Sequence, residues 1–288
     1  MPIRSFADLL DFLRDVKVEI DRDRVLAVAA GVTFYALLAI VPAITALISV
    51  FGLIMAPAEV PGLMAPVGSV LPEEAAALIT EQATRIAGKA GGTLSLTALI
   101  ALVIALWSAN GGTKALIEAL GIAYDAKETR SFLRLNLVAL GFTLGAIVLV
   151  IVLGVLVGLL PFLVDRMGQF GETLVLTLRW PAILALLLAV LAAIYAWAPD
   201  RPDAEWVWIT PGAVVAAIGL VAASAGFGWY VANFGSYDET YGSLAAVVVL
   251  MLWIWLSTVM VLVGAEINAE LDRRSAVYRG HARPVPAG

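Results

Sequence analysis

The sequence of 288 residues contains no cysteine and only one histidine, His281. Without cysteine the chain can form neither disulfides nor the thiolate sites that hold zinc and iron–sulfur clusters. A single histidine excludes histidine-based metal sites and a Ser/His/Asp triad within one chain. Walker A and dinucleotide-binding sequences are missing as well. We therefore expect no cofactor, no metal site and no catalytic residues, while a magnesium site built from carboxylates alone stays open.

Charged residues are also scarce, at 14% of the chain, whereas 61% of the residues are hydrophobic and the mean hydropathy is +0.95. Soluble domains carry about 25% charged residues. Uncharged runs recur along the chain, and each approaches the roughly 20 residues that a helix needs to cross a bilayer. The sequence therefore predicts an all-α polytopic membrane protein. The net charge of -5 includes no basic stripe, so nucleic acid is not an expected partner.

The apolar runs predict six transmembrane helices, with approximate bounds of 25–55, 93–112, 135–164, 180–198, 209–230 and 244–264. The basic residues test this count, because cytoplasmic loops of membrane proteins carry an excess of Lys and Arg. With the N-terminus inside, fourteen of the 18 basic residues fall in inner segments and four in outer segments. Both termini are therefore expected in the cytoplasm.

Three regions follow from this topology: a cytoplasmic amphipathic segment at 1–24, a transmembrane domain at 25–271 with an outer amphipathic insertion at 57–92, and a polar cytoplasmic tail at 272–288. In the first region one helical face collects Phe6, Leu9, Leu10, Leu13, Val16 and Ile20. We expect short interfacial helices in this segment and in the insertion. Simple packing is the favoured role, and a gate or lipid sensor is the alternative.

Small residues recur at the spacing that lets two helices approach closely. Gly141 with Gly145, and Gly154 with Gly158, form GxxxG motifs in the third predicted span, and Ala222 with Gly226 forms a similar pair in the fifth. We expect these positions to pack helices within the chain, with a homodimer face as the alternative.

Polar or helix-breaking residues inside a span are costly and therefore informative. Pro42 removes a backbone hydrogen bond in the middle of the first span, which predicts a static kink, or alternatively a hinge or substrate contact beside Tyr35. The second span ends at Asn110, two glycines and Lys114. Lys114 is expected to extend to the headgroups, or else to face the bundle and pair with Glu118 or Glu266.

The last span ends with Glu266, Asn268 and Glu270. The two glutamates are spaced as neighbours on one helical face, where like charges repel unless a cation serves them. We expect a cytoplasmic salt-bridge cluster with a role in structure or gating, rather than a catalytic pair. The cations predicted to serve it are Lys114, Arg130 and Arg134.

Three stretches carry a family resemblance: AAGVTFYALLAIVPAITALISVFG, LWSANGGTKALIEALGIAYDAKETRSFLRL and PGAVVAAIGLVAASAGFGWYVANFGSYDETYGSLAAVVVLMLWIWLSTVMVLVGAEINAEL. The sequence resembles the YihY/BrkB membrane proteins, long carried under a ribonuclease BN label. The resemblance implies a six-span protein of the bacterial inner membrane. It carries the family's marked positions onto Phe34, Tyr35, Pro42, Tyr124, Glu128, Arg130, Tyr237, Tyr241, Gly242, Trp253, Gly264, Glu266 and Asn268. The turn at Asn110 departs from the family pattern.

The expected function is transport, or handling of a lipid or envelope precursor, by a permease of the bacterial cytoplasmic membrane. Membrane lipids are the expected partners, and the favoured substrate is an amphiphilic anion held by Lys114, Arg130 and Arg134. One alternative is a scaffold or accessory subunit of an envelope complex, or a homo-oligomer. A second is an intramembrane enzyme that uses Glu266 or Glu270 with a metal. Ribonuclease activity is not expected, because the sequence lacks a His/Asp cluster and a basic RNA-binding surface.

Overall fold

The computed structural model describes residues 5–51, 76–77, 80–81, 96–201, 209–234 and 244–278. The predicted outer insertion at 57–92, apart from 76–77 and 80–81, and the tail beyond 278 lie outside these residues. Within them the chain forms helices joined by turns and contains no strand, so the all-α prediction is confirmed. The long helices are α1 (Phe6–Arg22), α2 (Val25–Phe51), α5 (Leu96–Ala123), α6 (Phe132–Trp197), α7 (Pro211–Phe234) and α9 (Ala245–Tyr278).

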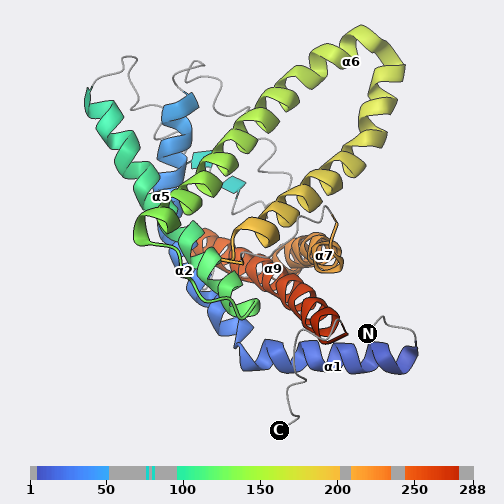
Figure 1. Cartoon of the computed structure of the whole chain (residues 1–288). Coiled ribbons are helices and arrows are strands. Elements are labelled where there is room, and N and C mark those ends of the chain that lie inside the picture. Colours follow the sequence, from blue (N-terminus) through green and yellow to red (C-terminus); the bar gives the residue numbers. More distant parts are fainter. Residues whose placement is uncertain are drawn as a thin grey trace.

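Helix α6 folds back on itself, and Figure 1 shows its two arms. A straight helix of 66 residues would be about 100 Å long. Residues just outside its two ends nevertheless touch, since the Arg130 guanidinium donates a hydrogen bond to the Ala198 carbonyl at 2.9 Å. The Thr129 amide likewise donates to the Asp200 carboxylate at 2.9 Å. The third and fourth predicted spans are therefore the two arms of one folded helix.

One end of the bundle gathers helix ends that are far apart in the sequence. We call it the charged end; it comprises α1, the turns that follow α1 and α5, both ends of α6, the start of α7 and the last turns of α9. Ion pairs join α1 to the turn after α5, and that turn to α9. Arg201, after α6, pairs with Asp272 of α9 at 2.8 Å. Successive helices therefore run alternately away from this end and toward it.

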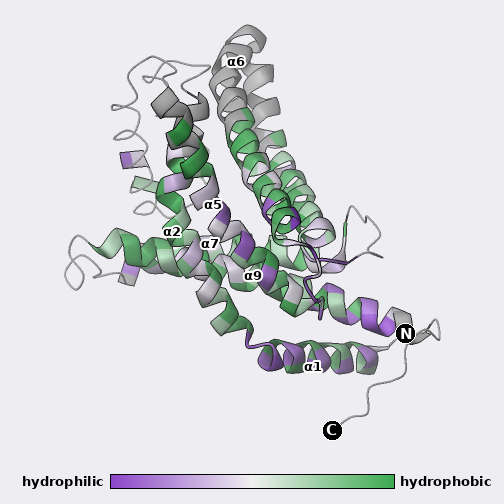
Figure 2. Cartoon of the chain, turned by 60° about the vertical axis from the view of Figure 1, so that its left-hand side comes forward, coloured by the Kyte–Doolittle hydropathy of each residue, from purple (hydrophilic) through white to green (hydrophobic). Residues whose placement is uncertain are grey.

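Four described segments are long and apolar enough to cross a membrane: Val25–Thr45, Phe132–Val150, Pro211–Val231 and Ala245–Ser275. A shorter apolar helix covers Pro181–Trp197. In Figure 2 hydrophobic residues dominate α2 and the coloured parts of α6, while hydrophilic residues concentrate on α1 and the end of α9. A multi-pass membrane protein is thus supported, and the count of six spans stays a prediction.

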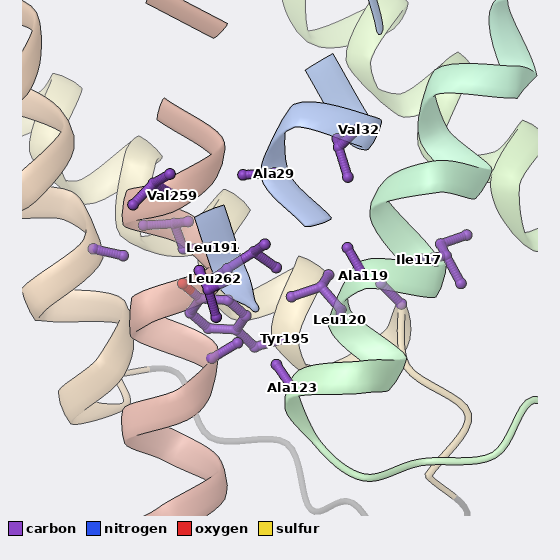
Figure 3. Packing of buried hydrophobic residues seen from close by; sticks show 14 of the residues in the cluster. Ala29, Val32, Ile117, Ala119, Leu120, Ala123, Leu191, Tyr195, Val259 and Leu262 are labelled. Atoms are coloured by element: carbon purple, nitrogen blue, oxygen red, sulfur yellow. The ribbon is translucent and has the colours of Figure 1, made fainter. Parts of the chain in front are cut away.

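The core forms where α2, α5, α6, α7 and α9 meet near the charged end. Figure 3 shows Tyr195 of α6 among Leu120 and Ala123 of α5 and Leu262 of α9. The Tyr195 hydroxyl donates a hydrogen bond to the Val261 carbonyl at 2.7 Å, which satisfies its polar atom inside the core. This packing holds the second arm of α6 against α9.

Glycines set the closest helix contact. A Cβ atom on Gly212 of α7 would collide with the carbonyl oxygen of Gly264 of α9 and would lie 2.6 Å from the Asn268 amide oxygen. At Gly264 a Cβ atom would in turn meet the Gly212 carbonyl oxygen at 2.5 Å. Helices α7 and α9 can therefore cross at this distance only because both positions lack a side chain.

The GxxxG prediction fails where the structure can test it. No described residue lies within 4 Å of a Cβ atom built on Gly141, Gly145 or Gly226. These glycines therefore face open space in the described part of the chain, instead of a helix contact. The side chains around Gly154 and Gly158 are outside the described residues. The spacing alone did not reveal which glycines meet a partner, because that depends on the rotation of each helix.

Helix α1 lies across the charged end, and the chain changes direction between α1 and the start of α2 (Figure 1). Ser5 and Asp8 form a capping box at its start. Its predicted apolar face is divided: Val16 packs with Phe12 against Ile267 of α9, whereas the side chains toward the N-terminus are exposed, namely Phe6, Leu9, Leu10 and Leu13. An amphipathic helix is confirmed, with only part of its apolar surface used inside the chain.

Candidate functional site

A groove of about 350 Å³ opens between α2, α5 and α9. Its walls are largely apolar because small side chains line it, among them Ala36, Ala39 and Ala43 of α2 and Gly112 of α5. The remaining lining residues are Val32, Ile40, Ala109, Thr113, Leu116, Trp253, Ile254, Ser257, Thr258 and Val261. This volume lies at the lower end of the range of ligand pockets.

The polar atoms of the groove are few, and most are already bonded. Thr113 and Thr143 share a hydrogen bond of 2.9 Å, and Thr258 donates to the Ile254 carbonyl of its own helix at 2.8 Å. The Trp253 ring nitrogen donates to Ser224 of α7 at 3.2 Å. The Ser257 hydroxyl forms no hydrogen bond with a described residue. Ser257 is therefore the polar group that the groove leaves for a ligand.

Pro42 and Tyr35, the predicted hinge and contact residues of α2, lie outside the groove lining. Pro42 is inside a helix that continues through it, between the lining residues Ile40 and Ala43. Tyr35 is 52% exposed, and its ring packs edge-on against Phe34 at 5.4 Å between ring centroids. The predicted substrate contact through Tyr35 is therefore not placed in this groove.

A network of polar side chains joins α5 to the first arm of α6. Asn110 is buried, and its amide nitrogen donates to the carbonyl and side-chain oxygens of Asn136, both at 3.3 Å. The Lys114 ammonium group donates to the same side-chain oxygen at 3.1 Å. The amide oxygen of Asn110 is buried without a hydrogen-bond partner. Asn110, where the sequence departs from the family pattern, thus makes a helix–helix contact from inside α5, which continues to Ala123 and does not end at the two glycines.

Lys114 adopts neither of the predicted arrangements. Its ammonium lies 5.9 Å from the ring of Trp107, seven residues earlier in α5, so the side chain does not extend past the helix end. It forms no ion pair with Glu118, Glu266 or another carboxylate in the described residues. The reason is its position: Lys114 faces α6, where Asn136 supplies an oxygen. Phe132 lies against Trp107 beside it, at 6.5 Å between ring centroids.

Arg130 joins the two ends of α6. Its side chain is only 5% exposed and binds the Glu128 carboxylate, the Ala198 carbonyl and, at 3.9 Å, Asp200. The hydrogen bond from Arg130 holds the pKa of Glu128 below its ordinary value, and hydrogen bonds from Thr129 do the same for the pKa of Asp200. These contacts engage the Nε and Nη2 groups of Arg130, so its guanidinium is held between the two ends of α6.

Arg134 is exposed on α6, and its guanidinium has no hydrogen bond within the described residues. Lys114, Arg130 and Arg134 therefore have different surroundings. Lys114 lies between α5 and α6, Arg130 is bound at the ends of α6, and Arg134 is exposed and acts with Arg130 on the Asp200 carboxylate. The anion-binding role predicted for all three stays a prediction.

Glu270 forms the predicted salt-bridge cluster, but with different cations. Arg273 and Arg274, one turn further along α9, bind its two oxygens at 3.2 and 2.6 Å. Arg274 also pairs with Asp15 of α1, and Arg273 with Asp125 after α5 at 2.7 Å. Two arginines at local helical spacing reach Glu270 before any more distant cation can. The cluster ties α1 and the turn after α5 to α9.

Glu266 is separate from Glu270 despite their spacing. Its side chain is 0% exposed, and neither carboxylate oxygen has a hydrogen-bond partner. Glu266 and Glu270 therefore do not act as a pair.

Asn268 connects α9 to α7 and to the turn after α5. Its amide oxygen accepts the Gly212 N–H at 2.9 Å, and its nitrogen donates to Thr210 at 3.0 Å and to the Tyr124 hydroxyl at 3.3 Å. Burial raises the pKa of Tyr124 to about 12, and the Arg201 guanidinium lies 3.9 Å from its ring centroid. Asn268 is therefore a packing residue at the glycine crossing of α7 and α9.

Sequence reasoning missed Asn136, Ser257 and Arg273. Asn136 carried a usable signal, since it is a lone amide at the start of an apolar run. Ser257 and Arg273 had no such signal, because a serine is common in membrane helices and an arginine is common at their ends. Among the described residues, no three Asp, Glu or His side chains form a metal-ligating group.

Comparison with known proteins gives several relatives. YfkH of Bacillus subtilis (strain 168), a protein described as ribonuclease-like, is 34% identical over 194 residues, covering 64% of this chain and 67% of YfkH. A UPF0761 membrane protein of Azoarcus sp. (strain BH72) is 30% identical over 275 residues, covering 91% of this chain. One of Methylibium petroleiphilum is 26% identical over 269 residues, covering 90%.

This chain spans 63% of the length of the Azoarcus protein and 62% of that of Methylibium. No solved structure matches the chain. The family model described as virulence factor BrkB matches residues 16–287, which include the groove, the polar network and the charged end apart from the first ten residues of α1. The chain therefore belongs to the virulence factor BrkB family of membrane proteins.

Proposed function

We propose that the chain is a permease of the bacterial cytoplasmic membrane that handles a lipid or a lipid-linked envelope precursor. The observation that carries this proposal is the apolar groove between α2, α5 and α9. The lining residues that come from α2 and α9 lie within segments that are long and apolar enough to span a bilayer. A ligand that enters it from the membrane must have an apolar part, because most of the lining offers only carbon atoms.

The proposed topology has six crossings with both termini in the cytoplasm. Helices α2 and α7 and the first arm of α6 leave the charged end, and α5, α9 and the second arm of α6 return to it. This alternation supports six crossings, and the basic residues favour a cytoplasmic charged end.

In this proposal the groove binds an acyl or polyprenyl chain, and Ser257 binds a polar group of the ligand. Lys114 lies across α5 from the groove, beside Asn136 and exposed Trp107. A headgroup at Lys114 would therefore belong to a different lipid from the chain in the groove. The substrate is recognised mainly through its apolar part, and the expected headgroup selectivity is weak.

The test uses full-length protein in nanodiscs of phosphatidylethanolamine and phosphatidylglycerol that contain a phospholipid with a photoreactive acyl chain. Mass spectrometry then locates the labelled residues. We expect labelling at the groove residues Ala39, Ala43 and Ser257 above that of lipid-exposed faces. Ala43→Phe fills the groove and should reduce this labelling, whereas Val41→Phe, at a 51% exposed position two residues away, should not.

Equal labelling of the groove and the exposed helix faces, unchanged by Ala43→Phe, would contradict the proposal. If the groove is labelled but the protein in vesicles moves no fluorescent lipid across the bilayer, the protein binds lipid and is not a permease.

A scaffold role is the second candidate, and the open glycines favour it. Gly141 and Gly145 lie on α6 with no described residue close to them, as a face for another helix would require. Gly141→Leu should then abolish oligomers or co-purifying envelope proteins. If the wild-type protein is a monomer that purifies without other proteins, the scaffold role is excluded.

A further inference from the structure

The charged end contains an acidic cluster that the proposed function does not use. The cluster consists of Glu19 on α1, Asp23 in the next turn, Asp125 after α5 and Glu266 on α9. Glu266 is the fully buried member, at 0% exposure, and both of its carboxylate oxygens lack a hydrogen bond. One carboxylate oxygen of Asp23 is also buried without a partner. A carboxylate in this position is unexplained by packing, since an apolar residue would meet no such penalty.

The charges around Glu266 are mostly of its own sign. Asp23, Glu19 and Asp125 act on it as like charges, and Tyr124 lies near it with a neutral hydroxyl. Arg273 is the cation that opposes them, but its guanidinium is bound to Asp125 at 2.7 Å and to Glu270 at 3.2 Å. Glu266 therefore has carboxylates nearby and no cation of its own.

A metal ion does not fit this arrangement. Within the described residues no three acidic or histidine side chains come together closely enough to ligate one. A proton needs neither several ligands nor free volume, and it removes the charge of a buried carboxylate outright. The absence of a hydrogen-bond donor to either oxygen also fits a neutral carboxyl group better than a carboxylate.

We propose that Glu266 is a proton-binding site, which holds a proton in the folded bundle at neutral pH and exchanges it through the acidic cluster at the charged end. Proton loss would leave a buried charge, and Arg273 is the cation that opposes it among the described residues. The Arg273 nitrogen that lies 3.6 Å from Glu19 is buried without a hydrogen-bond partner, and its movement toward Glu266 would draw Arg273 from Asp125 and Glu270. The proton thereby controls the contacts that tie α1 and the turn after α5 to α9. This inference goes beyond lipid handling and stands whether or not the groove binds a lipid.

Infrared difference spectroscopy of the full-length protein in nanodiscs tests the site directly. At pH 7 we expect the carbonyl stretch of a protonated carboxyl group in wild type and its loss in Glu266→Gln. Glu118→Gln, which changes an exposed glutamate of α5, should keep the band. A wild-type spectrum without the band, or a band of equal strength in Glu266→Gln, would overturn the proposal. So would a band that disappears when sodium replaces choline at constant pH, because Glu266 would then bind a metal cation.

A second measurement covers the case in which Glu266→Gln folds poorly. A carboxyl group that stays protonated in the folded protein makes wild type less stable as the pH rises above about 4.3, the ordinary pKa of glutamate. Wild type and Glu118→Gln should lose stability over the same pH range, whereas in Glu266→Asp the pH range of this loss should be shifted. An identical pH profile for all three proteins would contradict the assignment to Glu266.

Discussion

Three glycines of α7 provide a graded test of how closely α7 and α9 cross. Gly212, Gly219 and Gly226 are spaced by seven residues, and each meets a different environment. A Cβ atom would collide with the Gly264 backbone at Gly212, would lie 2.8 Å from the Met260 sulfur at Gly219, and would meet no described residue at Gly226. The same substitution, glycine to alanine, therefore meets a rigid backbone at Gly212, a flexible side chain at Gly219 and no neighbour among the described residues at Gly226.

The expected magnitudes follow from these neighbours. Gly226→Ala should stabilise the protein by about 0.5–1 kcal/mol, because alanine loses less backbone entropy in a helix. At Gly219 the Met260 side chain can move. The gain in backbone entropy from alanine and the cost of displacing Met260 should therefore cancel to within about 1 kcal/mol. Gly212→Ala should cost about 3 kcal/mol, since overpacking against backbone costs about 1–3 kcal/mol and the Asn268 hydrogen bonds weaken by about 1 kcal/mol more.

The assay is unfolding of each purified full-length variant in mixed micelles by added SDS, followed by tryptophan fluorescence, since the chain has 8 tryptophans. We expect Gly226→Ala to be the most stable protein and Gly212→Ala the least stable, with wild type and Gly219→Ala close to each other between them. The reasoning is refuted if Gly212→Ala is as stable as Gly226→Ala, because the two helices would then not be in backbone contact.

Two further predictions concern the charged end. Asn268→Ala should destabilise the protein by about 2 kcal/mol, because three hydrogen bonds that include the one to Tyr124 are lost; Asn233→Ala, which loses only a bond to its own helix, should change stability by less than about 0.5 kcal/mol in the same assay. Arg130→Gln should cost about 2 kcal/mol at pH 7. The lowered pKa of Glu128 means that its ion pair stabilises the protein above pH of about 4.3 and is lost as the pH falls through the folded value. The difference between wild type and Arg130→Gln should therefore shrink in acid, and a constant difference would show that Glu128 is not the partner that matters.

Some properties of the site residues follow from the local sequence, and others depend on how the helices pack. Glu270 was correctly predicted to join a salt-bridge cluster, because a charged residue just past an apolar run must find water or a partner. Its partners were wrongly predicted, since Arg273 and Arg274 lie at local helical spacing whereas Lys114 faces another helix. The sequence contained the arginines but not the rotation of α5 that turns Lys114 away.

The glycines show the same limit from the packing side. Gly141 and Gly145 match the GxxxG motif yet meet no described residue, while the closest contact joins Gly212, four residues before Ala216, to Gly264, which has no small residue four positions away. A motif within one helix describes only half of an interface. The other half depends on which helix arrives opposite, and here that residue is 52 positions away in the sequence.

The sequence by itself determined the apolar helices, their membrane environment and the placement of charge at helix ends. These properties are local, because each helix satisfies its own backbone hydrogen bonds and each apolar run selects lipid or protein over water. The tertiary structure alone decided that the third and fourth predicted spans belong to one helix, α6, that a groove remains between α2, α5 and α9, and that Glu266 is buried without a partner. Those features depend on the rotation and pairing of helices, which contacts between distant parts of the chain fix.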